Sequence, residues 1–67
     1  MSFVKKEEEY ELDGHKVLHQ LIWDKHAGEA WFTWIDGQEW PYKYSWMKGT
    51  QNKPSKARVR QVIERYF

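Results

Sequence analysis

The sequence predicts an α+β fold in which an antiparallel meander of three or four strands is followed by one C-terminal helix. Two Asp-Gly pairs, Asp13-Gly14 and Asp36-Gly37, lie between apolar runs and are typical of two-residue hairpin turns. Near the C-terminus the apolar residues change to a helical repeat. With 67 residues, the chain has room for one small domain.

The first nine residues form an acidic segment that we expect to be flexible, so the folded binding domain would span residues 10–67. Glu7, Glu8 and Glu9 are interpreted as solvated charges rather than as a site. Tyr10-Glu11-Leu12 then alternates as a strand does, up to the first turn.

The segment from His15 to Trp23 is rich in Val, Leu, Ile and Trp, which favours a second strand. A helix is the alternative, because Val17, Leu18, Leu21 and Ile22 also share one helical face. In that case Asp13 would be the N-cap and Gly28 would follow the last turn, and the order of elements would be αββα.

Ala30–Ile35 is a strong strand by composition, and Gln38–Trp46 follows the second turn as another strand. Pro41 predicts an edge position or a bulge there. A two-residue turn fixes the register, with Thr33 opposite Trp40 and Trp31 opposite Tyr42. Phe32 and Trp34 then point to one face of the sheet, and the other face carries Trp31, Ile35, Trp40, Tyr42 and Tyr44.

The C-terminal helix is predicted after a polar loop over residues 48–54. Ser55 can cap its first turn. An apolar stripe recurs at i, i+3, i+4, i+7 and i+8, and consists of Val59, Val62, Ile63, Tyr66 and Phe67. This stripe predicts that one side of the helix packs on the sheet.

The aromatic content and the charge distribution give the first functional indications. Aromatic residues make up 18% of the chain, and more rings exist than one helix can cover. Residues 1–39 carry a net charge of −5 and residues 40–67 carry +6. This split indicates either a surface for nucleic acid or an acidic partner, or two halves that neutralise each other in the fold.

The sequence gives no indication of catalysis, a cofactor or a metal site. The serines lie in no nucleophile motif, the glycines are isolated turn residues, and cysteine is absent. His15, His19 and His26 are expected to be ordinary surface histidines. With no signal peptide and no membrane segment, we expect a cytoplasmic protein, or a nuclear one in a eukaryote.

A basic surface is expected on the side of the helix away from the apolar stripe. Arg58 and Arg65 align there with Gln61, and Lys53 and Lys56 lie near the helix start. Such cations can neutralise phosphates. A solvated helix surface explains the same pattern.

Several short motifs, taken in order, resemble a chromodomain. Glu7-Glu8-Glu9-Tyr10, Lys16-Val17-Leu18 and Trp34-Ile35-Asp36-Gly37 are similar to the opening, the second strand and the Trp-x-Gly strand of that family, and Trp46 precedes a closing helix. The resemblance implies a chromo-like or SH3-like small barrel. It also implies that Tyr10 and Trp34 form part of an aromatic cage for a methylated lysine.

Together these observations predict a non-enzymatic binding module or small regulator that recognises a protein partner. The basic residues named above would assist an aromatic face made by Tyr10, Phe32, Trp34 and Trp46. The alternatives are a nucleic-acid-binding protein and a structural homo-oligomer, with a homodimer as its simplest form.

Overall fold

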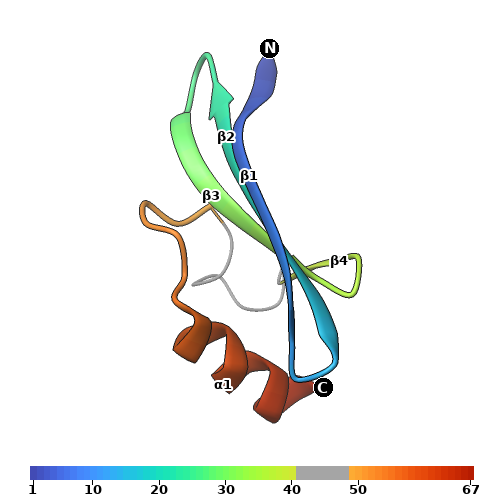
Figure 1. Ribbon diagram of the computed structural model, residues 1–67. Helices are drawn as coiled ribbons and strands as arrows, with labels where there is room; N and C mark the ends of the chain where they lie inside the picture. The colour runs from blue at the N-terminus through green and yellow to red at the C-terminus, as the bar shows by residue number, and fades with distance from the viewer. Residues whose placement is uncertain (41–48) are drawn as a thin grey trace.

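The computed structural model describes residues 1–40 and 49–67, which form one antiparallel sheet and one helix (Figure 1). The strands are β1 (Ser2–Leu12), β2 (His15–Asp24), β3 (Gly28–Ile35) and β4 (Gln38–Trp40), and the helix is α1 (Lys56–Tyr66). The strands lie in the order β1-β2-β3-β4. The predicted meander with a C-terminal helix is confirmed.

Both predicted hairpin turns are present and have the expected backbone geometry. Asp13 and Gly14 have φ angles of 51° and 80°, and Asp36 and Gly37 have 53° and 81°. Positive φ at both central positions is what a type I′ turn requires. The second turn places Thr33 opposite Trp40, as predicted. The pairing of Trp31 with Tyr42 and the rest of the expected strand to Trp46 lie outside the described residues.

The segment from His15 onward is a strand, which excludes the helical alternative. It pairs with β1 on one side and with β3 on the other.

The predicted start of the folded domain at residue 10 was wrong. The segment 1–9, expected to be flexible and outside the domain, belongs to β1 from Ser2 onward. Backbone pairing with β2 includes this segment in the sheet, although its side chains are exposed.

Helix α1 packs on one face of the sheet and closes the core. Ser55 caps the helix by accepting a hydrogen bond from the Arg58 amide at 3.2 Å. The buried core residues are Leu12, Val17, Ile35, Val59, Val62 and Ile63. The predicted stripe is therefore confirmed through Ile63, with Tyr66 half-buried beside it. Phe67 differs from the prediction, because it follows the last turn of the helix and is 45% exposed.

A buried polar cluster lies beside the apolar core. The His19 side chain is fully buried, so its prediction as a surface histidine is wrong. Its Nε2 atom lies 2.9 Å from the Tyr10 hydroxyl and its Nδ1 atom lies 2.8 Å from the Thr33 hydroxyl. Both ring nitrogens therefore have hydrogen-bond partners, which is what a buried imidazole requires.

The segment that leads to the helix is tied to the edge of β3. Trp31 and Thr50 exchange two backbone hydrogen bonds, of 2.8 Å and 2.9 Å. This bridge directs the chain from β3 toward the start of α1. No helix in the described part of the chain has the length and apolar character needed to cross a membrane.

Candidate functional site

The sheet has two faces with different environments. We call the side packed against α1 the helix face; its side chains are Tyr10, Leu12, Val17, His19, Leu21, Trp31, Thr33 and Ile35. Strand alternation directs the intervening side chains to the opposite side. We call that side the outer face; its side chains are Glu7, Glu9, Glu11, Lys16, Leu18, Gln20, Ile22, Ala30, Phe32 and Trp34.

Apolar side chains occupy the centre of the outer face. Leu18 of β2 lies directly opposite Trp34 of β3, and Phe32 lies two residues before Trp34 on the same strand. The Phe32 and Trp34 ring centroids are 6.2 Å apart. All three side chains are only half-buried. Helix α1 cannot cover them, because it packs on the other side of the sheet (Figure 1).

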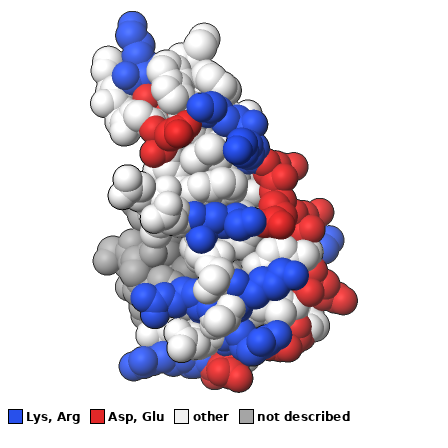
Figure 2. Space-filling model, turned by 60° about the vertical axis from the view of Figure 1, so that its left-hand side comes forward, with Lys and Arg blue, Asp and Glu red and all other residues white. Residues whose placement is uncertain are grey.

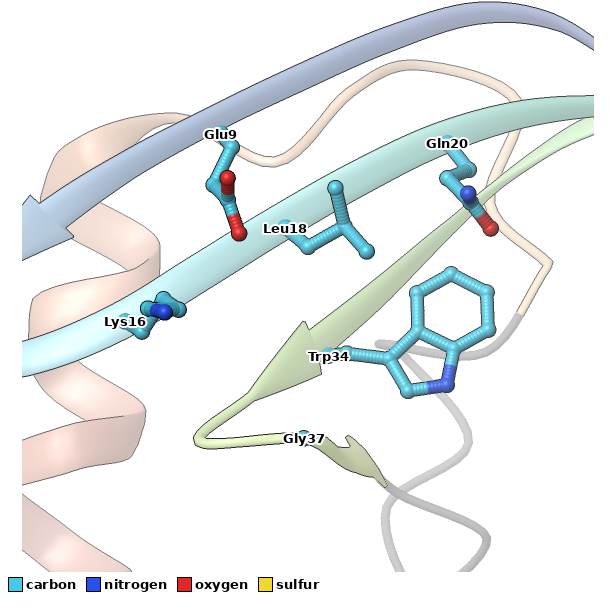
Figure 3. A pocket seen from close by; sticks show the side chains of 6 residues that line it. All are labelled: Glu9, Lys16, Leu18, Gln20, Trp34 and Gly37. Carbon is cyan, nitrogen blue, oxygen red and sulfur yellow. The ribbon is translucent and has the colours of Figure 1, made fainter.

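A hollow of about 390 Å³ opens beside these side chains (Figure 3). Its lining comes from all three long strands and from the β3–β4 turn, and consists of Glu9, Lys16, Leu18, Gln20, Trp34 and Gly37. Figure 3 shows the Leu18 side chain and the Trp34 indole between Glu9 and Lys16 at one end and Gln20 at the other. An apolar wall with a few polar groups around it is typical of a site that holds one anchoring side chain.

An acidic row runs along the outer face beside the hollow. Glu7, Glu9 and Glu11 alternate along β1 and are all exposed. Glu7 accepts a hydrogen bond from the Gln20 side chain at 2.5 Å. No described residue forms an ion pair with Glu9 or Glu11, although Lys16 of β2 lies opposite Glu11 in the strand register.

The structure separates two of the predicted site residues. Tyr10 lies on the helix face and Trp34 on the outer face, because their partners Val17 and Leu18 are consecutive on β2. Opposite faces of one sheet cannot line one cage, so the Tyr10–Trp34 pair that the chromodomain resemblance implies is not formed. Burial, followed by the nearby Glu8 charge, raises the pKa of Tyr10. Tyr10 thus belongs to the buried cluster around His19.

Phe32 and Trp34 share the outer face as predicted, and Trp46 lies outside the described residues. Sequence reasoning missed the other residues that line the hollow, Glu9, Leu18 and Gln20. Alternation along residues 15–24 predicts that Leu18 and Gln20 lie on the same face of the strand. The register between β2 and β3 was needed to place them beside Trp34.

Lys53 and Lys56 lie over the helix face and contact aromatic rings. Lys53 forms an ion pair with Glu8, and its ammonium lies 6.0 Å from the Trp31 ring centroid. The hydrogen bond from Lys53 holds the pKa of Glu8 below its ordinary value. The Lys56 ammonium lies 5.0 Å from the Tyr10 ring centroid. Both lysines therefore have partners within their own chain.

Arg58, Gln61 and Arg65 share one side of α1, as the helical spacing predicts. Together with Val62 and Tyr66 they line a smaller hollow of about 150 Å³. That side adjoins the apolar stripe instead of facing away from it, because Val62 and Tyr66 of the stripe line the same hollow. The Arg65 guanidinium lies 5.6 Å from the Tyr66 ring centroid. Figure 2 shows Lys and Arg side chains in both the upper and the lower half of that view, and many of the Asp and Glu side chains along its right-hand margin.

The described residues contain no group of three or more His, Asp or Glu side chains placed to hold a metal ion. The absence of a metal requirement stays a prediction. Comparisons with protein-family models, curated proteins and solved structures found no match. The chromodomain resemblance therefore stays a prediction.

Proposed function

We propose that this domain is a non-catalytic binding module that recognises a protein partner through the outer face of its sheet. The observation that carries the proposal is the hollow beside Trp34 and Leu18, on a face that α1 does not cover. Partly exposed aromatic rings next to a hollow are typical anchors at protein interfaces.

The charges of the described residues favour a protein over nucleic acid at this face. Glu9 lines the hollow, and Glu7 and Glu11 lie opposite its lining residues Gln20 and Lys16. Carboxylates repel a phosphate backbone. Part of the basic charge of the C-terminal half is also neutralised within the chain, because Lys53 pairs with Glu8 and Arg60 pairs with Asp13 at 3.0 Å. These pairs support the interpretation that the two halves neutralise each other.

Nucleic-acid binding is the second candidate, and one observation favours it. Arg58 and Arg65 line the hollow of about 150 Å³ on α1, where the Gln61 amide and the Tyr66 ring are adjacent. Two guanidinium groups beside an aromatic ring suit a phosphate and a stacked base. This site lies on a different element from the Trp34 hollow, so variants can separate the two candidates.

Affinity capture from a cell extract, with and without nuclease, tests both candidates with the same variants. We expect a captured protein to persist after nuclease treatment, to be retained by the Arg58→Ala/Arg65→Ala variant and to be lost with Trp34→Ala. Loss of a buried aromatic anchor typically weakens binding by at least about 2 kcal/mol, or roughly 30-fold.

Phe3→Ala is the matched control for Trp34→Ala. Phe3 is an aromatic residue of the same sheet, is 52% exposed, pairs with Trp23 near the end of β2 and is not among the residues that line the hollow. Circular dichroism verifies that each variant is folded. Capture that disappears with nuclease and with the double arginine variant, but survives Trp34→Ala, would reverse the proposal in favour of nucleic acid.

A further inference from the structure

We infer that the partner of the outer face presents an apolar anchor side chain flanked by Lys or Arg. The anchor occupies the hollow beside Trp34, and the flanking cation lies against the acidic row of β1. This inference rests on the proposed function and specifies the chemistry of the partner.

Three acidic groups on or near the helix face have partners within the chain. Glu8 pairs with Lys53, Asp13 pairs with Arg60, and Glu29 pairs with Lys5 at 2.7 Å. Each pair joins residues distant in sequence, so folding itself matches these charges. A partner is not needed to neutralise them.

The acidic row on the outer face lacks such matching. Glu9 and Glu11 have no ion-pair partner among the described residues, and the contact to Glu7 comes from the neutral side chain of Gln20. In the described part of the chain, Lys16, which lies opposite Glu11, is the one cation of β2 on this face, and it faces three carboxylates of β1. Among residues 1–40 and 49–67, the outer face therefore carries more carboxylates than cations beside its apolar hollow.

Alternate residues of a strand lie about 7 Å apart, so the three carboxylates extend in a line on both sides of the hollow that Glu9 lines. A Lys or Arg one or two residues from the anchor of a bound segment reaches this line. Complementary charge around an apolar anchor supplies specificity and speeds association.

The same charges disfavour two other occupants. A second copy docked face to face would bring two acidic rows together, because both partners of a two-fold contact use the same patch. A phosphate polymer would be repelled by the row. A basic protein segment is the occupant whose charge complements the face.

Selection of short random peptides displayed on phage against the immobilised domain tests the inference. We expect the recovered sequences to share an aromatic or large aliphatic residue with Lys or Arg within two positions, and to lose binding to Trp34→Ala. Trp34-dependent peptides without basic residues would overturn the inference but leave the proposed function standing. If no peptide depends on Trp34, both fail.

A second measurement isolates the acidic row. For a selected peptide, Glu9→Gln with Glu11→Gln should weaken binding about three- to tenfold, the range for two exposed ion pairs. Glu64→Gln, which removes an exposed carboxylate on α1 rather than on the sheet, is the control and should leave the affinity unchanged. Equal effects of the outer-face and α1 changes would contradict a local role of the row.

Discussion

His19 joins three strands at one buried point. It lies on β2, and its two ring nitrogens contact the Tyr10 hydroxyl of β1 and the Thr33 hydroxyl of β3. A neutral imidazole can donate from one nitrogen and accept at the other, and a hydroxyl can do either. A neutral ring forms both hydrogen bonds with one nitrogen donating and the other accepting. A protonated ring forms both only if the two hydroxyls act as acceptors.

The stability of the domain should fall in mild acid because of His19. Burial, and then the nearby Lys53 charge, lower the pKa of His19 below its ordinary value of 6.5. The unfolded chain then takes up the proton at a higher pH than the folded protein, so protonation favours unfolding as the pH falls below that value. Urea unfolding at about pH 7.5 and about pH 5.5 measures the loss.

The His19→Gln variant should lose less stability than the parent protein over this interval, although it starts from a lower stability. His26→Gln is the control, because His26 is exposed in the turn between β2 and β3. A decrease of equal size in the parent protein and in His19→Gln would show that other groups cause the acid sensitivity.

The face of the sheet on which a residue lies could not be predicted where it depends on how two strands pair. Phe32 and Trp34 were correctly placed on one face, because both lie on one strand and alternation fixes their side. Placing Tyr10 relative to Trp34 required the pairing of β2 with β3. The loop between these strands has no two-residue turn signal, and a shift of one residue exchanges the two faces. The same uncertainty concealed the burial of His19.

At the scale of elements, α1 packs on the sheet through apolar residues whose helical spacing is visible in the sequence. Val59, Val62 and Ile63 are buried against Leu12, Val17 and Ile35 of the first three strands. The β1–β2 and β3–β4 turns and the helix cap were predictable because a few residues determine each locally. The length of β1 was not predictable from the sequence. Its N-terminal half is charged and has no apolar pattern, and it belongs to the sheet because its backbone pairs with β2.

Val62→Ala should lower the free energy of unfolding by roughly 1–3 kcal/mol, because it removes two methyl groups from a fully packed site. Val62 is 1% exposed. Chemical denaturation monitored by tryptophan fluorescence measures the change. Glu64→Ala, in the same helix but exposed, should change stability by less than about 0.5 kcal/mol. Equal effects of the two substitutions would show that this side of α1 is not docked.

At the scale of the whole molecule, the acidic and basic halves of the sequence interleave in space. The ion pairs Lys53–Glu8 and Arg60–Asp13 connect the α1 region to the β1–β2 hairpin. The expected charge split is therefore real in the sequence but partly neutralised in the fold. Long-range pairs of this kind could not be predicted, because no local spacing indicates which distant residues meet.

Two surfaces remain that differ in character. The outer face combines the hollow beside Trp34 with an acidic row, and the far part of α1 combines two arginines with an aromatic ring. We propose that the first of these surfaces recognises the partner. They lie on different elements, so a residue-by-residue map of binding can distinguish them.

The most direct test is nuclear magnetic resonance mapping of the ¹⁵N-labelled domain with the partner recovered by affinity capture. We expect the largest shifts at the Trp34 indole N–H and at the amides of Leu18, Gln20 and Phe32. The amides of Arg58, Gln61 and Arg65 should change little. Shifts confined to α1, with the Trp34 indole unchanged, would contradict the claim that the outer face is the binding site.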